Sequence, residues 1–255
     1  MFAQINELIK VIDDAVWGLP LICLIMVTGI LLTVRLGGVQ VRHLGKAFKF
    51  MFQDEEDGHG EVTSFGALCT ALSATIGTGN IAGVATAIAA GGPGALFWMV
   101  VAAFFGMATK YSEGLLAIKY RTIDQDGHVL GGPFYYIENG MGKKWKWLAK
   151  IFAFFGAGVG LFGIGTFTQV NSIASAVKNF FDPDMAHTVT VLGNDYSIAT
   201  VIAGILLTVF VGLVVIGGIK RISKVSEVVV PFMAVLYVVL CLIIVFTNIK
   251  AVPGA

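Results

Sequence analysis

One long uncharged stretch constrains this chain more than any other feature. Between Glu61 and Lys110 there is no acidic or basic residue, and the stretch holds two apolar blocks separated by a turn motif at residues 91–94. A bilayer core about 30 Å thick needs roughly 20 apolar residues per helix, so the stretch suffices for two crossings. Composition agrees, since 56% of the residues are hydrophobic and 13% are charged, against about a quarter charged in soluble domains. The sequence therefore predicts an all-α integral membrane protein.

Six charge-free windows are long enough to be spans. The first follows a segment of mixed charge that lacks the basic character of a cleavable signal peptide, so we expect this helix to remain in the mature protein. The predicted spans are Ala15–Val34, Val62–Ala90, Ala95–Thr109 with an extension to about Ile118, Ile151–Val177, Tyr196–Ile219 and Val228–Ile249.

Lysine and arginine predict the orientation of these spans. With the N-terminus outside, thirteen of these residues fall on the cytoplasmic side and three on the outer side. Cytoplasmic loops carry an excess of basic residues, so both termini are predicted to lie outside.

The connections also carry signals. Gly91–Gly94 predicts a tight turn, because glycine permits positive φ and proline stops a helix. The basic and aromatic segment Leu44–Phe52 predicts a helix on the membrane surface, and the acidic residues 54–57 predict a solvated linker. The segment Gly131–Ile137 holds a turn followed by two tyrosines. Together with the lysines and tryptophans of residues 143–147, it is typical of interfacial anchoring.

The first apolar block contains an unusual centre, Ser73-Ala-Thr-Ile-Gly-Thr-Gly-Asn80. In secondary transporters, helices unwind near the bilayer midplane so that free backbone groups hold ions and substrate, and closely spaced glycines permit such unwinding. The hydroxyls of Thr75 and Thr78 and the amide of Asn80 can ligate a cation. The alternative is that the hydroxyls bond back to their own helix while small residues allow close packing.

Two further polar groups lie in predicted spans. Gln169, followed by Asn171 and Ser172, contacts either substrate or a neighbouring helix, because an unsatisfied amide is costly in hydrocarbon. Lys110 and Glu113 share a helical face and form either a proton relay or a structural ion pair, and their depth near the interface favours the pair.

The sequence argues against several other functional classes. The glycine pattern around Gly77 misses the dinucleotide fingerprint, the four histidines are scattered without a partner in register, and no basic cluster with interleaved aromatics suggests nucleic acid. The three cysteines lack metal-ligand spacing. We therefore expect no enzyme and no nucleic-acid partner.

Four motifs together resemble the sodium:alanine symporter family, also called alanine or glycine:cation symporters. They are Thr70–Thr86, Gly91–Ala95, Phe105–Tyr111 and Gly131–Tyr136. The resemblance covers nearly the whole chain. It implies a multi-pass protein of the plasma (inner) membrane with a LeuT-like fold, in which two inverted five-helix repeats enclose substrate and sodium.

On this resemblance, residues 1–61 form an extra N-terminal transmembrane helix and a cytoplasmic loop. Residues 62–249 form the first five-helix repeat, with a discontinuous first helix, and residues 250–255 form a tail. The implied sodium ligands are the carbonyls of Ser73, Thr75 and Ile76 and the side chain of Asn80. The implied substrate-binding residues are Thr75, Gly77, Thr78, Gly79 and Gln169.

The implied activity is sodium-coupled symport by alternating access. The substrate is a small neutral amino acid, alanine or glycine, because Ala74 and Gly79 leave little room, and sodium is co-transported. Membrane lipid is the surrounding partner. A channel-like or purely structural membrane module is the alternative, and it needs no sodium coupling.

The family that the chain resembles is about twice as long, so on this resemblance we expect the second inverted repeat to be missing here. Three explanations are a truncated gene or fragment, a half-transporter that assembles with another copy or a separate second half, and a folding module without transport. The first is favoured, since a second copy inserts the same way up and cannot supply an inverted repeat. We therefore expect this chain alone not to accumulate alanine.

Overall fold

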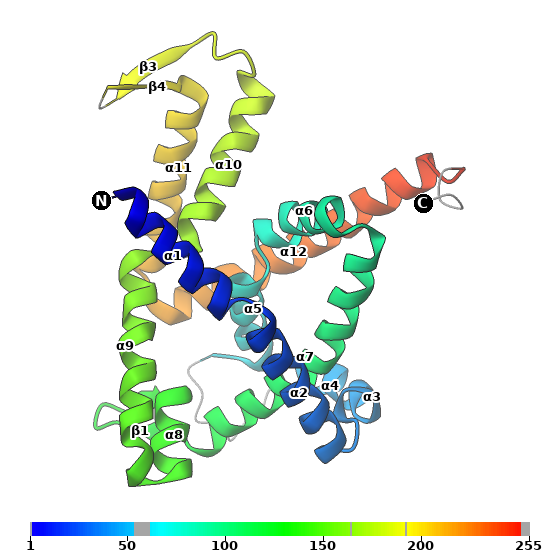
Figure 1. Cartoon of the computed structure of the whole chain (residues 1–255), viewed down its shortest axis with the longest axis vertical. Helices are drawn as coiled ribbons and strands as arrows, with labels where there is room; N and C mark the ends of the chain where they lie inside the picture. The colour runs from blue at the N-terminus through cyan, green and yellow to red at the C-terminus, as the bar shows by residue number, and fades with distance from the viewer. Residues whose placement is uncertain (1, 54–61, 164, 192, 251–255) are drawn as a thin grey trace. The chain divides into compact units, whose positions relative to one another are not determined.

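The structure is a computed structural model that describes residues 2–53, 62–163, 165–191 and 193–250, and most of their regular structure is helical (Figure 1). Its elements are α1 (Phe2–Val16), α2 (Leu19–Arg35), α3 (Val39–Arg42), α4 (Leu44–Met51), α5 (Ser64–Thr75), the 3-10 helix η1 (Thr78–Asn80), α6 (Ala82–Gly91), α7 (Pro93–Lys119), β1 (Thr122–Ile123), β2 (Val129–Leu130), α8 (Pro133–Met141), the 3-10 helix η2 (Lys143–Trp145), α9 (Lys146–Phe162), α10 (Thr166–Phe181), β3 (Thr188–Val191), β4 (Asn194–Ser197), α11 (Ile198–Val215) and α12 (Gly218–Thr247).

The helices agree with the predicted spans. Within the described residues, five helical segments are long and apolar enough to cross a membrane, and the bent pair of α5 with η1 and α6 makes a sixth if it counts as one span. The predicted boundary that differs most is the start of the last span, because α12 begins at Gly218 and not at Val228. Lys220, Arg221 and Lys224 end a charge-free window, but lysine and arginine are good helix formers, so the helix runs through them.

The predicted span Ile151–Val177 is two helices. The first, α9, ends at Phe162, and α10 begins at Thr166. Gly163 has a φ of 59° and Gly165 a φ of 90°, a backbone conformation that side chains other than glycine adopt only at a cost. Two glycines with positive φ therefore interrupt a segment that hydropathy alone predicts to be one continuous helix.

The connections agree with the sequence at two places and differ at a third. Gly92, with a φ of 69°, joins α6 directly to the proline that begins α7, which confirms the predicted tight turn. A helix is also found at Leu44–Met51, although its location on a membrane surface stays a prediction. Between Gly131 and Ile137 the predicted turn is short, and the two tyrosines that follow it lie in a helix that was not predicted, α8, which Pro133 begins. The acidic linker, residues 54–57, lies outside the described residues.

The chain divides into two compact units, Met1–Lys49 with Val84–Gly158 and Phe50–Gly83 with Val159–Ala255. In the first unit, α2, α3 and α8 pack against α7. Gly29 of α2 is buried there, and a Cβ atom on it would lie 2.9 Å from Cβ of Phe105 and 3.0 Å from its carbonyl oxygen. The small residue thus lets two long helices approach at backbone distance.

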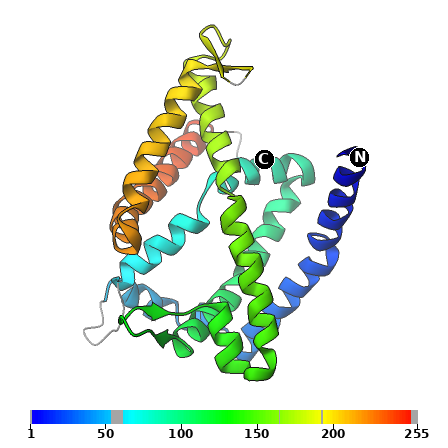
Figure 2. The same ribbon diagram turned by 90° about the vertical axis from the view of Figure 1, so that its left-hand side faces the viewer.

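In the second unit, α5 packs along α12, and α10 packs against α11. The antiparallel hairpin of β3 and β4 lies at the end of the α10 and α11 pair in both ribbon views (Figures 1 and 2). Asp182, at the end of α10, is buried and accepts a hydrogen bond of 2.6 Å from the Ser197 hydroxyl, which precedes α11. This contact ties the hairpin to the helix pair.

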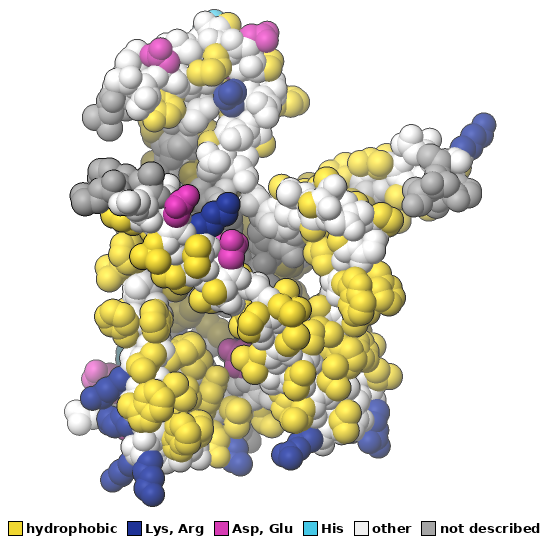
Figure 3. Space-filling model, viewed as in Figure 1, with side chains coloured by type: hydrophobic (Ala, Val, Ile, Leu, Met, Phe, Trp, Pro, Cys, Tyr) yellow, Lys and Arg dark blue, Asp and Glu magenta, His cyan; other side chains and the backbone are white. Residues whose placement is uncertain are grey.

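Burial is distributed as a membrane protein requires. The buried hydrophobic residues of the described chain are mostly small, whereas large apolar side chains lie on the outer faces of the helices (Figure 3). Lipid tails are as apolar as leucine, so helices in a membrane pack through small residues and leave large ones to the lipid. The members of the buried set are Val39, Cys69, Ala108, Ala149 and Val230.

Candidate functional site

The apolar block at the centre of the predicted site is broken. Helix α5 ends at Thr75, Ile76 and Gly77 are extended, and η1 begins at Thr78. The segments Ser64–Thr75 and Thr78–Gly91 are bent by 71°. Unwinding therefore falls on the glycine-punctuated residues that the sequence singled out.

Asn80 stabilises the break by diverting a backbone donor. Its Oδ1 accepts a hydrogen bond of 3.0 Å from the Gly77 amide, which in a continuous helix would donate to the carbonyl of Ser73. The amide of Asn80 in turn donates to the Gly77 carbonyl at 3.0 Å. The two bonds close a compact loop and end the α-helical ladder.

Backbone groups become free as a result. Within the described residues, the carbonyls of Ser73, Thr75 and Ile76 accept no backbone hydrogen bond, and the amides of Thr78 and Gly79 donate none. A polar backbone group without a partner is costly in the hydrocarbon core of a bilayer. Free carbonyls at the end of one helix and free amides at the start of the next are thus suited to a cation and an anion, respectively.

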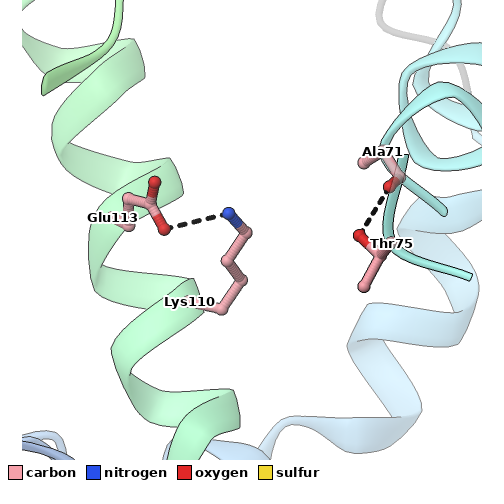
Figure 4. Close-up of polar contacts among 4 residues, drawn as sticks. All are labelled: Ala71, Thr75, Lys110 and Glu113. Atoms are coloured by element: carbon pink, nitrogen blue, oxygen red, sulfur yellow. Dashed lines mark hydrogen bonds and ion pairs between the residues drawn. The ribbon is translucent and has the colours of Figure 1, made fainter. Parts of the chain in front are cut away.

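The hydroxyls of Ser73 and Thr75 bond back to their own helix, which is the alternative to cation binding that the sequence left open. Ser73 Oγ donates to the Thr70 carbonyl at 2.7 Å. Thr75 Oγ1 donates to the Ala71 carbonyl, also at 2.7 Å (Figure 4). Each oxygen keeps lone pairs that a cation can use. The free carbonyl oxygens are nevertheless the better cation ligands of this segment.

The structure brings Gln169 to the break. Helix α10 contacts η1, and a Cβ atom on Gly77 would lie 2.9 Å from Nε2 and 3.1 Å from Cδ of Gln169. The absence of a side chain at Gly77 therefore makes room for this amide. Ser172, on the same helix, donates instead to its own backbone at Thr168.

The pair predicted on α7 is an ion pair. Lys110 Nζ lies 2.9 Å from Glu113 Oε2, and both side chains are exposed (Figure 4). Tyr136 of α8 faces it, and burial, followed by the charge of Glu113, raises the pKa of its phenol while Lys110 opposes the shift. These contacts favour the structural role over a proton relay.

Sequence reasoning missed three polar side chains in the second unit. Asp182 and His187 line one end of an apolar cavity of about 560 Å³ between α10 and α11, and Glu227 of α12 accepts a hydrogen bond from Thr63 at the start of α5. The N-cap signal Thr63-Ser-Phe-Gly66 was readable in the sequence, but its partner on α12 was not.

Comparison with known proteins identifies the family. A profile of the "Sodium:alanine symporter family" matches residues 2–255. An uncharacterized transporter of Haemophilus influenzae is 51% identical over 98% of this chain and 51% of its own length. A Methanococcus maripaludis protein named sodium/alanine symporter AgcS is 47% identical over 95% of this chain and 51% of its own length. The chain spans about half the length of these relatives. It belongs to the sodium:alanine symporter family.

Proposed function

We propose that this chain contributes one wall of a sodium and amino-acid site in a symporter of alanine or glycine. The observation that carries the proposal is the break between α5 and α6, where backbone groups are free and Gln169 lies against Gly77. Family membership supports a transporter over an enzyme.

Sodium binds at the end of α5 in this proposal. The carbonyls of Ser73, Thr75 and Ile76 supply hard oxygen donors at the negative end of the helix dipole. Asn80 Oδ1 already accepts one hydrogen bond, and a carbonyl oxygen with two lone pairs can still ligate a cation.

The amino acid binds on the other side of the break. The free amides of Thr78 and Gly79 point from the start of the next helical segment, where an anionic carboxylate is stabilised, and Thr75 and Gly77 complete this stretch of backbone. The amide of Gln169 adds a polar group from α10. The small side chain of Ala74 and the absence of one at Gly79 support alanine or glycine.

The finer architecture is also part of the proposal. Residues 62–249 would form the first repeat of a LeuT-like inverted-repeat transporter, following an extra helix within residues 1–61, with residues 250–255 as a tail. The N-terminus would lie outside the plasma membrane, as the lysine and arginine distribution favours. Transport would proceed by alternating access around the broken helix.

A chimera tests this function. This chain replaces the aligned segment of the Methanococcus symporter, so that the relative supplies its remaining half, and labelled alanine uptake is measured in proteoliposomes. We expect saturable uptake that needs a sodium gradient and that glycine inhibits. Flux that neither saturates nor needs sodium would favour a channel-like protein, and absence of flux in a folded chimera would contradict symport.

A further inference from the structure

A polar contact joins the start of α5 to α12. Thr63 is the N-cap of α5, and its Oγ1 accepts a hydrogen bond of 3.0 Å from the Gly66 amide. The same hydroxyl donates to Oε1 of Glu227 at 3.0 Å. The Glu227 carboxylate is thus linked to the N-terminus of α5 through the Thr63 hydroxyl. A carboxylate in this position is stabilised by the helix dipole and by a charge-assisted hydrogen bond.

The two helices are in close contact at this point. Gly66 is buried, and a Cβ atom on it would overlap Oε1 of Glu227 and Oγ of Ser223. Cys69, one turn further along α5, is 1% exposed, and Ser223 of α12 is 3% exposed. Glu227 thus sits at the edge of a tightly packed, small-residue interface between α5 and α12.

The position matters because α5 carries the proposed sodium ligands at its other end. A rigid helix transmits a shift at its N-terminus to the carbonyls of Ser73, Thr75 and Ile76. Resting on the proposed function, we infer that Glu227 is a positioning residue that, through Thr63, fixes the sodium-binding half-helix on α12. Loss of Glu227 therefore weakens apparent sodium affinity more than it slows transport.

The native thiol of Cys69 reports on this contact without any need for transport. In a background with Cys23→Ser and Cys241→Ser, the chain is expressed in membranes and the alkylation rate of Cys69 is measured. We expect slow labelling in this background and labelling about threefold to tenfold faster in Thr63→Val, as the loss of one ordinary hydrogen bond would give. Thr63→Val is the deciding variant because it keeps the carboxylate of Glu227, whereas Glu227→Ala should also label faster but removes a charge near the thiol as well.

Conservative variants separate positioning from general damage. Thr63→Ser keeps the hydroxyl and should restore slow labelling, and Glu227→Gln, which keeps an acceptor, should fall between Glu227→Ala and the parent. Glu113→Ala, on α7 and outside this interface, is the matched control and should label slowly. Unchanged labelling of a folded Glu227→Ala or Glu227→Gln protein would overturn the inference.

Transport kinetics in the chimera complete the test. For Glu227→Gln we expect the sodium concentration at half-maximal alanine uptake to rise about threefold to tenfold, with the maximal rate within about twofold of the parent. Faster labelling with unchanged sodium dependence would reduce Glu227 to a structural contact and overturn the inference. If the parent chimera shows no uptake while labelling behaves as expected, the proposed symport is contradicted. The inference that Glu227 positions α5 on α12 is then still supported.

Discussion

A methyl group at Gly77 is expected to displace the amide of Gln169 and to weaken substrate binding. The backbone of Gly77 is extended, with a φ of −146°, so alanine fits there without backbone strain. Its Cβ, however, would lie 2.9 Å from Nε2 of Gln169, closer than van der Waals contact allows. The flexible glutamine side chain, and not the helix, should therefore move.

The expected loss of alanine affinity follows from losing the contact between the Gln169 amide and the bound amino acid. One neutral hydrogen bond contributes about 1 kcal/mol, or roughly fivefold in affinity, and an off-rotamer side chain costs about 0.5–1.5 kcal/mol. We expect Gly77→Ala and Gln169→Ala each to raise the alanine concentration for half-maximal uptake about fivefold. The double variant should also show about fivefold and not roughly 25-fold, because both changes remove the same contact.

The assay is sodium-dependent alanine uptake by the chimera, combined with thermal unfolding of each variant in detergent. Gly204→Ala is the steric control, because Gly204 lies on α11 outside the proposed site and a Cβ atom there would meet nothing within 4 Å. Multiplying effects in the double variant would refute the shared contact, as would a Gly77→Ala protein with unchanged uptake.

Three further predictions concern stability. Gly29→Ala should overpack the interface of α2 with α7 and cost about 1–3 kcal/mol of unfolding free energy, whereas Gly212→Ala, whose Cβ meets nothing within 4 Å, should be neutral or stabilising in the same thermal unfolding assay. Gly92→Ala should cost about 1–3 kcal/mol, because a φ of 69° combined with a ψ of −173° is a backbone conformation that essentially only glycine adopts, and an unchanged melting temperature would contradict this. The hydrogen bond from Ser197 lowers the pKa of Asp182 below its ordinary value of 3.8, so its stabilisation is present above that pH and is lost as the pH falls through the lowered pKa. The difference in melting temperature between the parent and Asp182→Asn should be constant from about pH 7 to 5 and shrink below about pH 4, and a difference independent of pH would exclude this role.

Local signals made much of the fold predictable. The windows without charge located the spans, since a bilayer core excludes unpaired charge over about 20 residues. The glycine and proline at residues 92 and 93 located a turn because their backbone requirements are local. The polar and glycine-rich centre at Ser73–Asn80 located the break for the same reason.

Contacts between distant segments could not be predicted in this way. That Gln169 lies against Gly77 depends on how α10 packs beside η1, and that Thr63 donates to Glu227 depends on the path of α12 along α5. Residues 220–227 of α12 were left outside the predicted spans because charge was taken as the end of a span, although charge ends only the part of a helix that hydrocarbon covers. Packing of separate helices, and not local propensity, decides such positions.

An experimental structure of the chimera with sodium and alanine tests the central claim most directly. We expect the alanine carboxylate within hydrogen-bond distance of the amides of Thr78 and Gly79, the Gln169 amide against the bound amino acid, and sodium coordinated by carbonyls of Ser73, Thr75 and Ile76. Alanine and sodium bound away from the break between α5 and α6 would contradict the assignment of this segment as a wall of the transport site.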